Sequence, residues 1–300
     1  MGSTSFESIT AYFPEKLRKL MLSIPATLLE DLTEIRLRTA GPVYLVYSDR
    51  ILYLCISGRL SSVYNESAYI VGASVIRDIV DRLCHFSVHS CTKQLSEGFF
   101  VIENGVRVGL SGAYSSSINP ILTEFTSLNF RLSRSVDGCA EEIFSSYYDN
   151  NIMICGGVNS GKTTILRDIC RLSGNLRKTA LIDERNEISC LCKGVPQRSI
   201  GAMTDVISNI SRSEGIVSAI RTLSPEVIVC DEIASVDDSE AIINGIGCGV
   251  KFIVTAHGNC FTELMKRKEI IKLKDSGLMD IIVFLKGASA PGKIREVVRL

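Results

Sequence analysis

The feature that most constrains the fold is a glycine-rich turn between an apolar run and an amphipathic stretch. Residues 156–163, GGVNSGKT, match the pattern G-x-x-x-x-G-K-[ST] at every fixed position. The run NIMI shortly before the turn predicts a buried strand, and KTTILRDI after it predicts a helix. A strand, this turn and a helix in that order predict a P-loop.

A P-loop binds the phosphates of a nucleoside triphosphate through its backbone. Gly156 and Gly161 leave room for successive N–H groups to point at the phosphates from the start of a helix, whose dipole also favours anions. Lys162 is expected to reach the β- and γ-phosphates, and the Thr163 hydroxyl is expected to bind Mg²⁺. ATP and Mg²⁺ are thus the expected cofactors. The predicted nucleotide-binding residues are Gly156, Gly157, Val158, Asn159, Ser160, Gly161, Lys162, Thr163 and Thr164.

The second half of the chain alternates strand-like and helix-like segments. The apolar runs KTALID, EVIVCDE and KFIVTAH are separated by segments of helical period such as GIVSAIRTL. Unbroken apolar strands in a βαβ rhythm predict a parallel sheet that helices cover on both faces. We therefore expect an α/β ATPase domain over residues 149–300.

The first half contains a different mixture of elements. FESITAYFPEKLRKLMLSI predicts one or two short helices interrupted at Pro14, and the alternation in LTEIRLRT predicts a half-buried strand. Asn104-Gly105 predicts the turn of a hairpin. A helix over VDGCAEEIFSSYY leads to the expected boundary, so residues 1–148 are predicted to form a smaller α+β N-terminal domain.

Acidic residues follow two predicted strands of the second half. EVIVCDE ends in Asp231 and Glu232, the arrangement of a Walker B motif, in which Asp231 would hold Mg²⁺ and Glu232 would polarise the attacking water. A second cluster comprises Asp183, Glu184 and Glu187, although a solvated, salt-bridged turn would have the same sequence. Ligands bind at the carboxyl ends of parallel strands, so both clusters are candidates for the site.

His257, one of three histidines in the chain, lies at the end of the strand-like segment KFIVTAH. Together with Thr255 it stands where a sensor of the γ-phosphate would be. A lone histidine is more often structural, and the sequence leaves both interpretations open.

Other functional classes fit less well. The chain has no N-K-x-D segment, no L-S-G-G-Q between the P-loop and Walker B, and no arginine-rich lid, which disfavours a GTPase, an ABC ATPase and a small-molecule kinase. The net charge is zero, so nucleic acid is not an expected partner. No run approaches the roughly 20 apolar residues that span a bilayer. Eleven cysteines without a signal peptide are typical of a cytosolic protein.

Taken together, GGVNSGKTT, IDERNE, AIRTLSPEVIVCDEI and VTAHG resemble the motifs of the type II/IV secretion and pilus-retraction ATPases. That superfamily has a P-loop, an acidic box, a Walker B motif and a histidine box in this order. The closer similarity is to a member specific to spore-forming bacteria, which shares the upstream EIRLR. The resemblance implies a RecA-like ATPase domain; it is dense over residues 150–260 and thinner before them.

The resemblance also implies roles for individual residues. The second acid of the acidic box, which activates water in the superfamily, falls on Glu187, and the Walker B glutamate falls on Glu232. We favour Glu187 as the base, with Glu232 as the open alternative. His257 matches the terminal histidine of its box, and Arg221 matches an arginine before the Walker B strand.

Such enzymes are hexameric rings in which the N-terminal domain lends arginines to a neighbour's nucleotide. NFRLSR looks like that segment, which puts Arg131 first and Arg134 second, with Arg107 as a weaker candidate. A solvated strand face would also carry such arginines. The chain departs from the pattern at Asp183-Glu184, where most members have Glu-Asp, and at Asp231, where they have glycine.

The motifs and composition predict a cytoplasmic, Mg²⁺-dependent ATPase, and the resemblance implies that it works as a homo-hexameric ring. Its partners would be membrane proteins of a sporulation secretion or channel complex, an expectation that rests on the resemblance alone. The alternative is a nucleic-acid-translocating ring ATPase of RecA type, because it shares the same core. A nucleotide-binding scaffold that scarcely hydrolyses ATP is a third candidate, suggested by the unusual acids.

Overall fold

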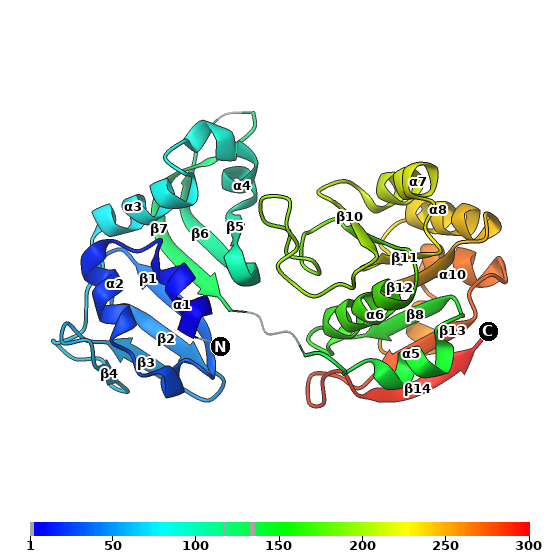
Figure 1. The fold of residues 1–300 in the computed structure, drawn as a ribbon, viewed down its shortest axis with the longest axis horizontal. Helices are drawn as coiled ribbons and strands as arrows, with labels where there is room; N and C mark the ends of the chain where they lie inside the picture. The colour runs from blue at the N-terminus through cyan, green and yellow to red at the C-terminus, as the bar shows by residue number, and fades with distance from the viewer. Residues whose placement is uncertain (1–2, 117, 133–135) are drawn as a thin grey trace. The chain divides into compact units, whose positions relative to one another are not determined.

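The computed structural model describes residues 3–116, 118–132 and 136–300. The chain divides into two compact units, residues 1–134 and 135–300, which run from blue to green and from green to red in Figure 1. Each unit contains its own seven-stranded sheet. No helix within the described ranges is both long and apolar enough to cross a membrane.

The first unit is an antiparallel sheet with short helices packed against it (Figure 1). The strands lie in the order β4-β3-β2-β1-β7-β6-β5. The strands are β1 Leu32–Arg38, β2 Tyr44–Tyr47, β3 Ile51–Leu54, β4 Leu60–Ser61, β5 Phe99–Ile102, β6 Val106–Tyr114 and β7 Leu122–Arg131. The helices are α1 Ser3–Thr10, α2 Glu15–Leu22, α3 Ala73–Leu83 and α4 Thr92–Glu97, with 3-10 turns η1 Ala26–Leu28, η2 Val88–Cys91 and η3 Glu103–Gly105.

Local signals explain where several of these elements begin and end. Pro14 directly precedes α2 with a φ of −55°, and because proline has no N–H to donate, α1 and α2 stay separate helices. Between β5 and β6, Asn104 and Gly105 have φ values of 60° and 63°, the left-handed region that tight hairpin turns require. The interruption at Pro14 and the hairpin at Asn104-Gly105 are both confirmed.

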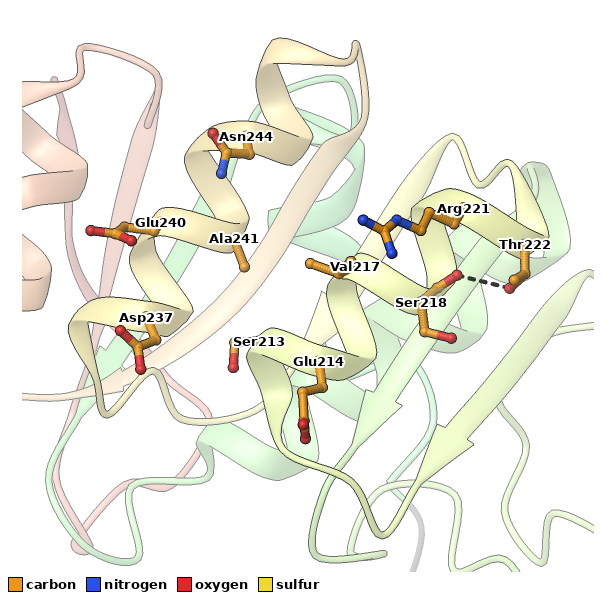
Figure 2. A pocket seen from close by; sticks show the side chains of 10 residues that line it. All are labelled: Ser213, Glu214, Val217, Ser218, Arg221, Thr222, Asp237, Glu240, Ala241 and Asn244. Carbon is orange, nitrogen blue, oxygen red and sulfur yellow. Dashed lines mark hydrogen bonds between the residues drawn. The ribbon is translucent and has the colours of Figure 1, made fainter.

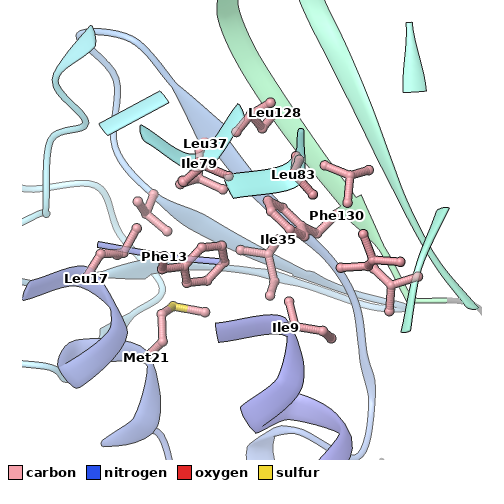
Figure 3. Packing of buried hydrophobic residues seen from close by; sticks show 14 of the residues in the cluster. Ile9, Phe13, Leu17, Met21, Ile35, Leu37, Ile79, Leu83, Leu128 and Phe130 are labelled. Carbon is pink, nitrogen blue, oxygen red and sulfur yellow. The ribbon is translucent and has the colours of Figure 1, made fainter. Parts of the chain in front are cut away.

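The core of the first unit lies where its helices meet the sheet (Figure 3). Phe13 and Phe130 contact each other edge to face, with ring centroids 5.1 Å apart. The apolar side chains around them come from α1, α2, α3, β1 and β7: Ile9, Leu17, Met21, Ile35, Leu37, Ile79, Leu83 and Leu128. All are buried, so hydrophobic contact fixes the helices to the sheet.

The second unit contains a sheet in the order β10-β9-β11-β12-β8-β13-β14, which is parallel up to the antiparallel pair β13–β14. Its strands are β8 Ile152–Gly156, β9 Thr179–Asp183, β10 Thr204–Ser208, β11 Val227–Cys230, β12 Lys251–His257, β13 Ile281–Leu285 and β14 Ile294–Arg299. Its helices are α5 Glu141–Tyr147, α6 Lys162–Leu176, α7 Arg212–Leu223, α8 Val236–Gly247, α9 Phe261–Leu264 and α10 Lys268–Asp275.

Helices cover both faces of this sheet. Successive residues of a strand point to opposite faces, and β8 shows the pattern. Ile152 and Ile154 belong to the apolar cluster with α5 and α6, whereas Met153 and Cys155 belong to the cluster with α7, α8 and α10. The predicted parallel sheet between two helical layers is therefore confirmed.

The structure differs from the sequence-based expectation at both ends of the second unit. The unit begins at residue 135, ahead of the expected boundary at 149, because α5 packs on α6. Ala140 and Ile143 are buried there, and the Ala140 N–H donates to Asp168 at 2.8 Å. The edge strand β10 was not predicted, because an edge strand is only partly buried and its sequence, TDVIS, lacks a continuous apolar run. The pair β13–β14 forms the other edge of the sheet.

Replacement of Phe130 by alanine should destabilise the first unit. The side chain is fully buried against Phe13, so its loss leaves a cavity, and we expect the free energy of unfolding to fall by about 3–5 kcal/mol. Urea unfolding followed by circular dichroism measures this loss. Phe86→Ala is the matched control, because Phe86 is 76% exposed and should contribute less than about 0.5 kcal/mol. Equal losses in the two variants would contradict this description of the core.

Candidate active site

The P-loop joins the end of β8 to α6, and its amides are open to an anion. Gly161 is the N-cap of α6, and as a glycine it has no side chain that could cap the first turn of that helix. Asn159 and Gly161 have left-handed φ values of 58° and 91°. The Lys162 Nζ donates to the carbonyls of Gly156 and Gly157 at 2.9 and 2.8 Å, so its ammonium lies over the loop. Uncapped amides beside a lysine are suited to binding phosphate.

The other predicted loop residues lie at the tip of the turn and in the first turn of α6. Val158 is 73% exposed, whereas Ser160 is buried and donates from its hydroxyl to the Gly157 carbonyl at 2.8 Å. Thr163 and Thr164 follow Lys162 in α6. The structure thus brings all nine predicted residues together in one loop and helix start.

The turn between β13 and β14 supports the P-loop from outside. A Cβ on Gly161 would lie 2.7 Å from the backbone nitrogen of Gly292, so only glycine permits this approach. The Gly292 N–H donates to the Ser160 carbonyl at 2.8 Å. The P-loop motif contains no signal for this contact, and sequence analysis missed it.

Asp231, directly after β11, faces the first turn of α6. Its Oδ2 accepts a hydrogen bond from the Thr163 hydroxyl at 3.3 Å, and its Oδ1 accepts one from the Thr255 hydroxyl of β12. Burial raises the pKa of the Asp231 carboxyl, and the carboxylates of Glu187 and Glu232 raise it further, against the lowering effect of the two hydroxyls. The two residues predicted to hold Mg²⁺ are therefore neighbours with hard oxygen donors.

Thr255 also holds the backbone after Asp231. Its hydroxyl accepts a hydrogen bond from the Glu232 N–H at 2.7 Å, and its carbonyl accepts one from the Ile233 N–H at 2.9 Å. Glu232 has a left-handed φ of 41°, which is uncommon outside glycine, so the chain turns sharply here. The Glu232 carboxylate lies 3.4 Å from the Arg185 guanidinium. The Thr255 hydroxyl is thus hydrogen-bonded to both acidic residues of the Walker B segment.

Residues 183–189, which follow β9 and which we call the acidic loop, are held together by the buried side chain of Asp183. Asp183 is 2% exposed, and its oxygens accept hydrogen bonds from the N–H groups of Glu187, Ile188 and Ser189 at 2.9, 3.2 and 2.8 Å. The Ser189 hydroxyl donates to it at 2.7 Å. Arg167 of α6 donates to the carbonyls of Glu187 and Ile188 at 2.8 and 3.0 Å. Two buried charges therefore hold this loop, which is not a solvated turn.

The acids after β9 and β11 meet around one small cavity of about 10 Å³, close to the space of a single water molecule. We call it the acid cavity, and it is lined by Asp183, Glu184, Arg185, Glu187, Arg212, Asp231 and Glu232. Arg212 of α7 lies 3.1 Å from Glu184 and 3.4 Å from Asp238. Sequence analysis missed Arg212, which belongs to no motif, and Asp238, whose spacing after Ser235 signals a helix cap and not a functional site.

His257 ends β12 beside the P-loop. It pairs in register with Gly156, and the next N–H, of Gly258, donates to the Gly156 carbonyl at 3.4 Å. The side chain of Asn259 packs on Gly157, where a Cβ would lie 2.7 Å from the Asn259 Oδ1. We call His257, Gly258 and Asn259 the histidine loop. The histidine loop therefore lies along the phosphate-binding turn.

Arg221 is not brought together with these residues. It lies on α7 and lines a groove between α7 and α8 with a volume of about 540 Å³ (Figure 2). Val217 and Asn244 line the same groove, and its described lining shares no residue with the acid cavity. Arg221 matches the superfamily pattern, but it lies in the helical layer formed by α7 and α8 and does not line the acid cavity.

The arginines predicted to act in trans belong to the first unit. Arg131 ends β7, its side chain is 63% exposed, and its Nε lies 3.9 Å from a carboxylate oxygen of Glu34. Arg107 is opposite Arg131 in register and lies over the ring of Phe99, 3.7 Å from its centroid. Arg134 lies outside the described residues.

The family follows from a match over nearly the whole chain. Residues 4–299 match the family described as "Sporulation stage III, protein AA". Stage III sporulation protein AA of Bacillus subtilis (strain 168) is 32% identical over 300 residues, which covers 96% of this chain and 94% of that protein. The chain belongs to this family. Both units lie within the match, so the first unit is as much a part of the family as the P-loop unit.

Solved structures identify the fold. The ATPase DotB of Legionella pneumophila has a TM-score of 0.55 at 15% identity, over 85% of this chain and 72% of that one. The pilus retraction motor PilT, solved with bound ADP, has a TM-score of 0.59 at 12% identity, over 86% and 75%. At such identities the likeness concerns the fold alone. The predicted α/β fold with a RecA-like parallel sheet and a P-loop is confirmed.

Replacement of Asp231 by asparagine should stabilise the metal-free protein. Because its pKa is raised in the folded state, Asp231 costs stability as the pH rises from the pKa of the unfolded carboxyl through that of the folded one, and an amide avoids this cost. In EDTA we expect the Tm at pH 8 to rise by about 2–4 °C, the effect of about 1 kcal/mol in a unit of this size. The gain should shrink as the pH falls toward about 4, where the carboxyl of the unfolded chain is also protonated.

Differential scanning calorimetry across this pH range tests the expectation. Asp205→Asn is the matched control, because Asp205 is an exposed aspartate of the same unit and its replacement should leave the Tm unchanged. A Tm of Asp231→Asn that is lower than wild type at pH 8 would show that the carboxylate stabilises the site.

Proposed function

We propose that the protein is an Mg²⁺-dependent ATPase of the secretion type. The observation that carries the proposal is the meeting of three segments at one edge of the sheet: the P-loop after β8, Asp231 after β11 and the acidic loop after β9. Parallel strands end at the same edge, so a ligand on the P-loop would face both sets of acids. The fold shared with the ATPase DotB and the motor PilT supports the same class.

The residues of the loop fit a magnesium-bound nucleotide. Lys162 would exchange its two loop carbonyls for the β- and γ-phosphates, and Thr163 and Asp231 would supply oxygen ligands to Mg²⁺. A cation there would offset the burial that raises the pKa of Asp231. Bound Mg²⁺ would supply charge neutralisation at the phosphates. His257, beside Gly156, would sense the γ-phosphate.

We assign the role of general base to Glu187. Its backbone N–H is bound by Asp183 and its carbonyl by Arg167, so the backbone from which its side chain enters the acid cavity is held in place. Glu232 lies 3.4 Å from Arg185, and the position that matches the water-activating acid of the superfamily is Glu187. A water in the acid cavity would lose its proton to Glu187 as its oxygen attacks the γ-phosphorus, while the bond from that phosphorus to the β–γ bridging oxygen breaks and ADP leaves with the oxygen.

We further propose a homo-hexameric ring in which Arg131 and Arg134 of one copy reach the nucleotide of the next. The 63% exposure of Arg131 and its long 3.9 Å separation from Glu34 support a guanidinium that can engage a second partner. The ring would act at the cytoplasmic face of a membrane-embedded secretion or channel complex of sporulation, in keeping with the family. Hydrolysis would move the two units relative to each other.

The rate of ATP hydrolysis per subunit should rise steeply with protein concentration, because each site is completed by a neighbouring copy. Lys162→Ala provides the inactive reference, with a loss of more than about 100-fold. Lys178→Ala, which removes an exposed lysine of the same unit, is the matched control and should keep the wild-type rate. A constant rate from a protein that light scattering shows to be monomeric would contradict the ring. Stimulation by single-stranded DNA that weakens with salt would favour the nucleic-acid-translocating alternative.

Glu187→Gln should lower kcat by more than about 100-fold, because an amide cannot accept the proton, whereas Glu232→Gln should stay within about tenfold of wild type. Single-turnover hydrolysis at saturating ATP separates this loss from changes in binding. Glu240→Gln on α8, outside the acid cavity, is the control for a glutamate exchange. The opposite order of the two losses would transfer the base role to Glu232.

A further inference from the structure

Arg267 connects two strand ends that carry site residues. It directly precedes α10, and each of its three side-chain nitrogens has a partner. The Nε donates to Glu269 at 2.7 Å, the Nη1 donates to the His257 carbonyl at 2.8 Å, and the Nη2 donates to the Ile233 carbonyl at 2.8 Å. His257 ends β12, and Ile233 follows the Walker B acids, so one planar guanidinium ties the two segments together.

Arg267 binds the carbonyl of two peptide groups, and the N–H of each of these peptide groups also has a hydrogen-bond partner. In the peptide group between His257 and Gly258, the N–H donates to the Gly156 carbonyl at 3.4 Å. In the peptide group between Ile233 and Ala234, the N–H donates to an Asp238 carboxylate oxygen at 3.1 Å. Because a peptide group is rigid and planar, a shift at one end moves the other.

The connection continues to the acidic loop. Asp238, in the first turn of α8, is 4% exposed and lies 3.4 Å from Arg212. Arg212 lies 3.1 Å from Glu184. Hydrogen bonds and ion pairs therefore run without a break from Gly156 through Arg267 to Glu184, a series that we call the arginine relay.

The other end of the arginine relay lies where a nucleotide would act. The Gly156 carbonyl accepts hydrogen bonds from both the Lys162 ammonium, at 2.9 Å, and the Gly258 N–H, at 3.4 Å. If Lys162 turned to a bound phosphate, this carbonyl would lose its charged donor, and the Gly258 N–H would be left as its partner. The position of the His257–Gly258 peptide group would then depend on whether the P-loop is occupied.

We propose that Arg267 is a positioning residue that couples occupancy of the P-loop to the placement of the acidic loop. The inference rests on the proposed function, since it requires a nucleoside triphosphate on the P-loop. Arg267 touches no nucleotide in this scheme and acts through the backbone of His257 and Ile233. Its fork of donors fits two separate carbonyls, and a lysine offers no such fixed geometry.

Hydrogen exchange of the nucleotide-free full chain tests the connection without hydrolysis. In Arg267→Gln, the segments around Ala234 and Gly258 should exchange at least about tenfold faster, because their peptide groups lose the partner at the carbonyl end. Arg177→Gln is the matched control: Arg177 also donates to a backbone carbonyl, that of Tyr148, but lies outside the arginine relay. It should leave both segments unchanged. Unchanged exchange in Arg267→Gln would overturn the proposal.

The second measurement adds Mg²⁺ and a non-hydrolysable ATP analogue. In wild type, both the P-loop and residues 183–189 should become protected from exchange. In Arg267→Gln the P-loop should still be protected, with the Kd of the analogue within about threefold of wild type, while residues 183–189 gain no protection and kcat falls at least about 30-fold. Arg267→Lys keeps the charge without the fork and should behave in the same way.

The two proposals fail in different ways. If the analogue protects no segment of the wild-type protein, the proposed function is wrong, and the nucleotide-free exchange at Ala234 and Gly258 still decides whether Arg267 holds both segments. If the analogue binds and residues 183–189 are protected equally in wild type and Arg267→Gln, the coupling role of Arg267 is wrong while the proposed ATPase stands.

Discussion

The parallel register of β8, β12 and β11 is the constraint on which the site depends. It places His257 opposite Gly156, and it pairs Cys230 with Val254, so that Asp231 comes level with Thr255. Strands that run in the same direction end at one edge, and their following residues come within hydrogen-bonding distance. Backbone pairing of the strands thus places the P-loop, the Walker B segment and the histidine loop next to one another.

Charged side chains around this edge fall into two groups with different tasks. Asp183 and Arg167, which are buried, and Arg267, which is partly buried, bind backbone amides or carbonyls, because a charge removed from water without hydrogen-bond partners would be costly. Glu187 and Glu232 line the acid cavity beside Asp183 and are the two candidates for the base. The first group gives the loops fixed shapes, and those shapes place the second group around a space that can hold a water molecule.

Sequence patterns predicted the parts of the fold whose signals are local. The P-loop motif carries its glycines, lysine and threonine in one segment, so its position before α6 could be predicted residue by residue. The apolar runs of β8 and β12 showed a sheet buried on both faces. The edge strand β10 and the membership of α5 in the second unit had no such signal, because packing against distant residues decided both.

By itself, the sequence determined the P-loop, the parallel sheet, the two acid clusters and the resemblance to secretion ATPases, because each depends on residue types at short spacing. Only the tertiary structure decided that Asp183 holds its loop and that Arg221 lies in a groove of the outer helical layer. It also joined Thr163 to Asp231 across 68 positions of the sequence and Arg267 to Ile233 across 34. Such contacts depend on strand order and on the path of loops, and no local pattern encodes either of these.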